Sequence, residues 1–225
     1  MEKILNKSNS FEFYKTNYDK LKKQNKDLKK RLNESNSKND FYSKKLINYQ
    51  KKLAKYTKPV ILDKINNGKF DELTVLIKSP NPAGDKHWGD YYFAIALKKS
   101  LEKKGFKVIH QEHDNWYDDI DADIVIVLRG LYEYEPNYDE INIMWNISHP
   151  DLVSDEEYEK YDIVCVASDY YSDILNERLN VKVESLLQCT DPEVFYNERD
   201  DSLEEELLFV GVTRHVYRQI VKDCM

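Results

Sequence analysis

The chain has 225 residues, 33% of them charged, and a formal net charge of −7 that is the sum of two opposite parts. Residues 1–58 carry 17 Lys and Arg against 6 Asp and Glu, whereas the rest carries 17 against 35. The acidic body is a poor match for nucleic acid. No segment reaches the roughly 18–20 apolar residues of a membrane helix, and the N-terminus lacks a signal-peptide run, so the composition predicts a soluble, cytoplasmic protein.

Residues 1–58 have the pattern of a basic coiled coil. Between Phe11 and Tyr56, 11 of the 14 seam positions of an unbroken heptad repeat are apolar or aromatic. Asn25 and Asn39 are polar entries of the kind that fix register and strand number. We therefore predict a parallel homodimer or homotrimer through residues 11–56. Two alternatives stay open: a partly disordered lysine-rich arm, and a basic helix that rests on an acidic membrane surface.

From residue 73 onward, short β-branched runs alternate with amphipathic stretches, which predicts a doubly wound, mostly parallel, Rossmann-like α/β sheet. The predicted strands are 73–79, 107–111, 123–129, 141–147, 163–168, 183–188 and 207–211. Asp90 is expected to cap the first helix of the body and Gly105 to end it. Further helices are predicted at 154–160 and 169–179, and from near Thr213.

The predicted domain order follows from these elements. It is a coiled coil at 1–58, a linker at 59–72, a Rossmann-like domain at 73–189, an interdomain linker at 190–206, and the start of a second domain at 207–225.

The residues that could carry chemistry follow the predicted strands, where ligands bind in doubly wound folds. All five histidines fall in these segments. The predicted site at this carboxyl edge is framed by Trp88, Trp116, Arg129, Trp145 and His149.

The segment between the first strand and the first helix of the body offers two candidates for a general base, His87 and Asp90. Asp90 could equally be a plain helix cap, and His87 a solvated loop residue. The glycines here form neither a dinucleotide-binding nor a P-loop pattern. No cofactor is predicted.

Two further candidates follow later strands. His149 precedes Pro150, which predicts an extended backbone, and it could deprotonate a ligand or simply bind a loop carbonyl. Arg129, followed by Gly130, suggests an anion partner, or else an ion pair with Glu133 or Glu135. The three cysteines lack metal-ligand spacing, so no metal site is predicted.

Six segments in order resemble the bacterial glycosyltransferases of the two-Rossmann (GT-B) type, in particular the CgeB-like, surface-polysaccharide-associated group. They are WGDYYFAIALKKSLEKKGFKV (88–108), DIVIVLRGL (123–131), INIMWNISHPD (141–151), YDIVCVAS (161–168), LLQCTDPEVF (186–195) and LLFVGVTRHVYR (207–218). The resemblance covers residues 73–218 and leaves the coiled coil outside.

The resemblance implies metal-independent transfer of a sugar from a nucleotide-sugar to a glycan or related acceptor. A side-chain base, drawn from Asp90, His87 and His149, would deprotonate the acceptor. By resemblance, the acceptor side is lined by Trp88, Gly89, Arg129, Gly130, Trp145, Asn146 and Ser148. The donor side begins with Gly211, Arg214 and Arg218.

Length limits this expectation. After the arm, the chain holds enough residues for one doubly wound domain of about 150 residues, so we expect the donor-binding domain to be absent and this chain alone not to transfer sugar. The alternative is a non-catalytic coiled-coil adaptor with a Rossmann-like ligand-binding domain.

Overall fold

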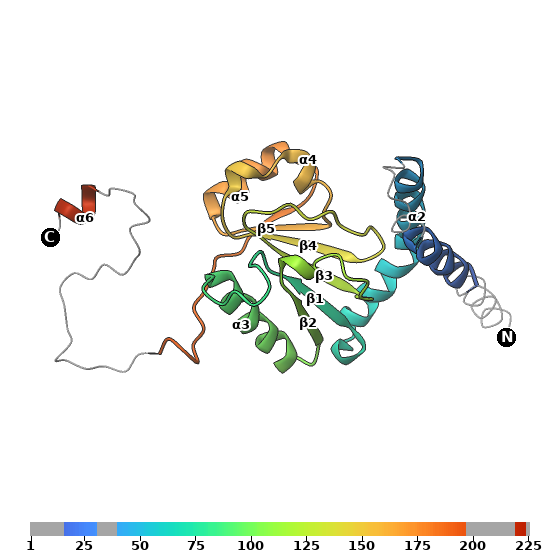
Figure 1. Cartoon of the computed structure of the whole chain (residues 1–225), viewed down its shortest axis with the longest axis horizontal. Coiled ribbons are helices and arrows are strands. Elements are labelled where there is room, and N and C mark those ends of the chain that lie inside the picture. The colour runs from blue at the N-terminus through green and yellow to red at the C-terminus, as the bar shows by residue number, and fades with distance from the viewer. Residues whose placement is uncertain (1–15, 31–39, 197–218, 224–225) are drawn as a thin grey trace. The chain divides into compact units, whose positions relative to one another are not determined.

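The computed structural model describes residues 16–30, 40–196 and 219–223 of the chain (Figure 1). The chain divides into two compact units, residues 1–189 and 190–225. Unit 1 holds the whole sheet. The described part of unit 2 contains one short helix, α6 (Gln219–Asp223). The predicted strand 207–211, with Gly211, Arg214 and Arg218, lies outside the described residues.

Unit 1 is built on a six-stranded sheet in the order β2-β1-β3-β4-β5-β6, with every neighbouring pair parallel (Figure 1). The strands are β1 (Thr74–Lys78), β2 (Lys107–Gln111), β3 (Ile124–Arg129), β4 (Ile141–Asn146), β5 (Ile163–Val166) and β6 (Val183–Ser185). The doubly wound, Rossmann-like α/β prediction is thereby confirmed, and each of these six strands was predicted within three residues at either end.

The strands read as nearly continuous apolar runs because both faces of the sheet are buried. On one face, Val75 and Ile77 of β1 pack with Ala94 of α3 (Gly89–Lys103). On the other, Leu76 packs with Val125 of β3 and Tyr158 of α4 (Asp155–Tyr158). This second face also receives Leu175 of α5 (Asp169–Arg178), so each face has its own core.

Helix α3 begins two residues earlier than a cap at Asp90 would place it. Its N-cap is Trp88, which makes no side-chain cap hydrogen bond, and Asp90 lies inside the first turn. The predicted capping role of Asp90 is therefore wrong, although an acidic residue in the first turn still complements the helix dipole. Gly105 has φ +100 just past the end of α3, as a C-terminal glycine requires.

The predicted coiled coil over residues 11–56 is not shown. Its described parts are two helices, residues 16–30 and α2 (Asp40–Asn66), which we call the arm; residues 11–15 and 31–39 lie outside the described residues. Three seam residues are buried within unit 1: Asn25, Leu28 and Leu53. Residues 59–66, predicted as a linker, continue α2 through Pro59, because Ile61 and Ile65, one turn apart, pack into the core beside α3.

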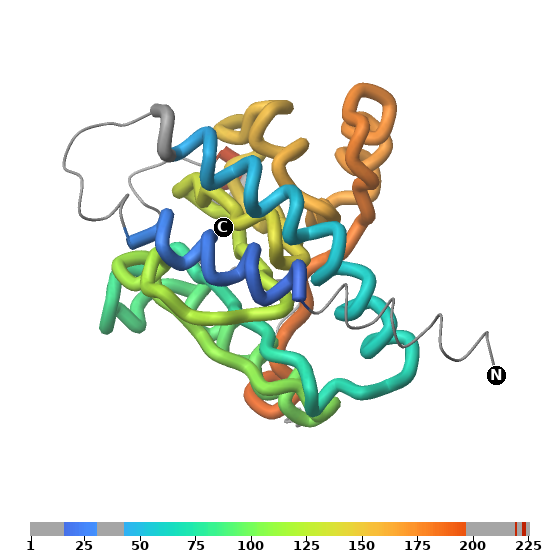
Figure 2. The backbone as a smooth tube through the Cα atoms, turned by 90° about the vertical axis from the view of Figure 1, so that its right-hand side faces the viewer, coloured from blue at the N-terminus to red at the C-terminus, as the bar shows by residue number. Residues whose placement is uncertain are grey.

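Both arm helices contact the loops that lead into β3, β4 and β5, at the amino edge of the sheet (Figure 2). Asn25 Nδ2 donates to Asp139 at 3.2 Å, and Gln50 Nε2 to Asn137 at 3.0 Å. Ion pairs join Lys22 to Asp121, Lys29 to Asp119 and Lys58 to Asp162. The basic and acidic parts of the chain are thus complementary surfaces of one unit.

Among the described residues, no helix combines the length and the apolar character needed to cross a membrane.

Leu53 tests how the arm is held. Its side chain is 2% exposed, whereas Leu62 of the same helix is 51% exposed. We expect Leu53→Ala to lower the free energy of unfolding by about 2–5 kcal/mol, because it leaves a cavity in a packed interface. Leu62→Ala is the matched control and is expected to change it by less than about 1 kcal/mol. Equal effects in urea unfolding would contradict the packing of α2 on the sheet.

Candidate functional site

The strand order places a switch point between β1 and β3, since the chain leaves β1 toward one side of the sheet and β3 toward the other. In open α/β sheets, ligands bind beyond the carboxyl ends of the strands at such a point. A side chain at Gly130, after β3, would lie 3.2 Å from Pro80 Cγ and 3.4 Å from Ser148 Oγ. The loops after β1, β3 and β4 therefore converge here, and only glycine fits between them without displacing a neighbour.

Two of the predicted catalytic residues, Asp90 and His149, lie on the segments that follow β1 and β4, whose loops converge at this point. Burial raises the pKa of the Asp90 carboxyl, and His149 lies close enough to oppose that rise. His149 Nδ1 is 3.0 Å from Ser148 Oγ. Asp90, in the first turn of α3, therefore lies within electrostatic range of His149, which contacts Ser148 in the loop after β4.

His149 does not have the predicted extended backbone. With φ 51 and ψ 50 it is left-handed, and it is the only non-glycine residue with positive φ among the described residues. The left-handed turn lets the His149 carbonyl accept a hydrogen bond from the Leu152 amide, which closes the 3₁₀ turn Pro150–Leu152. Such conformations cost roughly 1–3 kcal/mol and cluster at functional sites.

His87 is not part of this group. Its side chain is 99% exposed, and its Nδ1 lies 3.0 Å from Asp85 Oδ1 in the loop before α3. The His87 hydrogen bonds lower the pKa of Asp85, chiefly through the backbone amide. The alternative interpretation of His87 as a solvated loop residue fits this position.

Several of the residues predicted to line the site are instead buried, and their side chains hold backbone carbonyls in place. Trp116 is 1% exposed and its indole donates to the Ser79 carbonyl. Trp145 is buried against Phe93 and donates to the Leu186 carbonyl. Asn146 Nδ2 donates to the carbonyls of Arg129 and Ser148. Trp88 and Gly89 stand at the start of α3, where Trp88 is half-buried and Gly89 is exposed.

Arg129 is held in a buried ion pair. Its Nε lies 2.6 Å and its Nη2 3.0 Å from the two carboxylate oxygens of Glu157, while Nη1 and Nη2 also donate to the carbonyls of Gly130 and Leu152. The alternative prediction of an ion pair was right in kind but wrong in partner. Glu133 and Glu135 bind Lys160 instead. Because Arg129 and Glu157 are 28 residues apart, no local pattern joined them.

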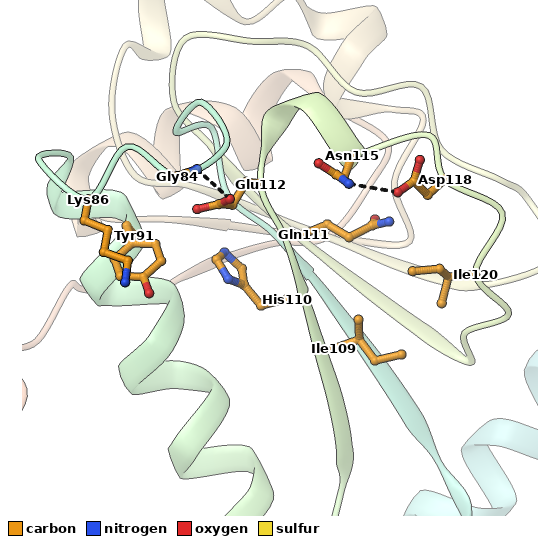
Figure 3. Close-up of a pocket in the computed structure, with 10 residues that line it drawn as sticks. All are labelled: Gly84, Lys86, Tyr91, Ile109, His110, Gln111, Glu112, Asn115, Asp118 and Ile120. Carbon is orange, nitrogen blue, oxygen red and sulfur yellow. Dashed lines mark hydrogen bonds between the residues drawn. The ribbon is translucent and has the colours of Figure 1, made fainter.

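A groove of about 450 Å³ runs along the carboxyl end of edge strand β2 (Figure 3). Lys86 and Tyr91 lie at one end, Asn115, Asp118 and Ile120 at the other, and His110 and Gln111 between them. Sequence reasoning missed most of these residues. The available signal was the polar segment HQEHDNWY after the second predicted strand, but the tryptophans and histidines elsewhere drew the prediction away from it.

A hydrogen-bond chain fixes the tautomer of His110. Asn81 Nδ2 donates to Glu112, so Asn81 Oδ1 is an acceptor, and the Ser79 hydroxyl donates a hydrogen bond to it at 2.5 Å. Ser79 Oγ must then accept from His110 Nε2 at 2.7 Å. Burial lowers the pKa of His110, which favours the neutral ring. Its Nδ1 is left as an acceptor, with no hydrogen-bond partner among the described residues.

A buried lysine supports the groove from behind. Lys78, at the end of β1, donates to Gln111 Oε1 at 2.5 Å and to the Trp116 carbonyl, and its ammonium lies 4.6 Å from the centre of the Tyr134 ring. Burial lowers the pKa of Lys78 to about 8. These contacts fix the Gln111 side chain and the loop after β2. In the part of the chain that the structure describes, no group of three or more His, Cys, Asp or Glu is arranged to hold a metal ion.

The buried ion pair gives a stability prediction. Glu157→Leu leaves the Arg129 guanidinium buried without its carboxylate, so we expect the free energy of unfolding to fall by about 3–5 kcal/mol. The double variant Arg129→Met with Glu157→Leu should recover much of that loss. Glu135→Gln, in an exposed pair with Lys160, is the control and should cost at most about 1 kcal/mol. Denaturant unfolding measures all three, and a Glu157→Leu cost as small as the control would refute the structural role.

Comparison with known proteins adds no relative to this picture. No protein-family model matches the chain, and no curated protein matches it.

Proposed function

We propose that the Rossmann-like part of unit 1 binds a saccharide, as the acceptor-side half of a GT-B glycosyltransferase of the CgeB-like group. The groove along β2 carries this proposal. It combines the carboxylates of Glu112 and Asp118, the amides of Gln111 and Asn115, and the Tyr91 ring.

This set of groups suits a polyhydroxylated ligand. Carboxylates accept hydrogen bonds from hydroxyls, and amides both donate and accept. An aromatic ring can cover an apolar face of a ligand. Lys86 is the only lysine or arginine among the lining residues, whereas Glu112 and Asp118 are carboxylates, so the groove is poorly matched to a phosphate-rich ligand. That balance favours the acceptor over the nucleotide-sugar as its occupant.

For the transfer step, we propose that Asp90, which precedes the groove residue Tyr91 in the first turn of α3, is the general base. Burial raises the pKa of the Asp90 carboxyl, which makes the carboxylate a stronger base, and the electrostatic influence of His149 reaches it. Asp90 would take the acceptor hydroxyl proton while the acceptor oxygen bonds to the sugar carbon and the bond from that carbon to the nucleotide diphosphate breaks. The proposed donor side would begin with Gly211, Arg214 and Arg218, which lie outside the described residues.

Saccharide binding tests the groove. Tyr91 lines it, whereas the neighbouring Tyr92 is 61% exposed and does not. We expect the full chain to bind at least one of glucose, galactose and N-acetylglucosamine. Tyr91→Ala should weaken that binding about three- to tenfold, as the loss of one aromatic contact implies. Saturation-transfer NMR titrations provide the measurement.

The matched control is Tyr92→Ala, which should leave the dissociation constant unchanged. The proposal fails if none of the three sugars binds the wild-type chain, or if the two tyrosine variants weaken binding equally.

Self-association is a separate part of the proposal. We propose that seam positions of residues 11–56 form a homo-oligomer, although Asn25, Leu28 and Leu53 are buried within unit 1. Sedimentation equilibrium of the full chain should then give a dimer or trimer at micromolar concentration. A monomer at every concentration would rule this out and leave the arm as an intramolecular element.

A further inference from the structure

The contact between the arm and the amino edge of the sheet lacks hydrogen-bond donors. Four buried oxygens in this contact have no partner among the described residues: Asn25 Oδ1, Asp139 Oδ1, Glu140 Oε2 and Asn142 Oδ1. Asn25, Glu140 and Asn142 are 5%, 8% and 1% exposed. Buried polar atoms are normally paired, and leaving one unpaired costs roughly 1–3 kcal/mol. A shared physical cause is therefore expected.

The pair Asn25 and Asp139 shows what is missing. The Asn25 amide donates from Nδ2 to Asp139 Oδ2 at 3.2 Å, so an amide and a carboxyl group lie against each other. The second oxygen of each group is then an acceptor without a donor. One proton on Asp139 Oδ1 would supply that donor and allow a second, reciprocal hydrogen bond to Asn25 Oδ1.

The neighbouring carboxyl group, that of Glu140, also lacks a hydrogen-bond donor. Its Oε1 accepts only a long, 3.4 Å hydrogen bond from Asn137, and its Oε2 accepts none. The Asn142 amide is held beside it, because Nδ2 donates to the Glu140 carbonyl at 3.0 Å and its Oδ1 stays unpaired. A protonated Glu140 carboxyl would add a second donor to this cluster.

The charged groups around the Asp139 and Glu140 carboxyls do not supply the missing hydrogen-bond donors. Burial is the largest influence on both; it raises the pKa of Asp139, and it raises that of Glu140 to about 7. The helix 16–30 opposes this with Lys22 and Lys29. From α2, Gln50 donates to Asn137, Thr57 donates to the Asp139 carbonyl, and the Lys51 ammonium lies over the Tyr138 ring. The other titratable groups that influence the two carboxyls are Asp121, which faces Asp139, and Lys78 and Tyr134, which face Glu140.

We propose that the arm is a proton-gated latch: a proton held by the Asp139–Glu140 pair joins the helix 16–30 to the amino edge, and loss of that proton loosens the arm. Both carboxyls hold their protons more tightly when the arm is docked than when they face water. Docking is therefore strongest in acid and weakens as the pH rises from about 4 through about 7. The latch does not rest on the proposed function, since the groove lies at the opposite edge.

Hydrogen exchange of the full chain tests the latch. After correction for intrinsic exchange, we expect the protection of amides 16–30 to fall at least about tenfold between about pH 5.5 and about pH 8.5. Protection of β3 and β4 should stay constant. In the double variant Asp139→Asn with Glu140→Gln, neither of the two side chains can titrate. This variant should show no such fall in protection between the two pH values.

Two further variants keep the outcome decisive. Asn25→Ala retains both carboxyls but removes the facing amide, so its protection of residues 16–30 at about pH 5.5 should drop toward the wild-type value at about pH 8.5. Glu102→Gln, in an exposed α3 pair with Lys98, should leave the wild-type pH dependence intact. Equal wild-type protection at both pH values, an unchanged pH dependence in the double variant, or full protection in Asn25→Ala would each overturn the proposal.

Discussion

The loops at the carboxyl edge of the sheet depend on the buried ion pair between Arg129 and Glu157. Arg129 is the last residue of β3, and its guanidinium reaches the carbonyls of Gly130 and Leu152 as well as the Glu157 carboxylate. The loops after β3 and β4 are thereby tied to α4. The left-handed turn at His149 lies between these anchors. A charge that would be costly to bury alone is stable here because every contact compensates its desolvation.

On the other side of the switch point, buried polar groups beneath the groove hold the loops after β1 and β2 in place. Lys78 and Trp116 hold the loop after β2, and Glu112 accepts hydrogen bonds from Asn81 and the Gly84 amide in the loop after β1. The two loops therefore position each other. Much of the charge at this edge maintains the shape of the site, and the neutral His110 ring, with one nitrogen committed to Ser79, is held by that shape.

The two edges of the sheet differ in how well their polar atoms are paired. At the carboxyl edge, the buried Arg129 and Lys78 have acceptors with short distances. Most of the buried side-chain atoms that lack a hydrogen-bond partner among the described residues lie at the amino edge. They are acceptor oxygens at the contact between the arm and the sheet. Such an interface is more sensitive to pH than the core, because protonation changes the number of donors without changing the packing.

The pattern of apolar and polar residues was enough to predict the strands and the edge of the sheet at which the candidate residues lie. The β-branched runs fixed six strands and their parallel pairing, because a sheet buried on both faces needs continuous apolar strands, and the residues after those strands placed Asp90, Ser148 and His149 at one edge. Which polar residues bind each other is evident only from the folded chain. Arg129 pairs with Glu157, and Lys78 with Gln111, across separations that local patterns do not encode. The heptad repeat likewise predicts a buried helical seam, but whether a second chain or the protein's own acidic loops cover it depends on packing energies between distant segments.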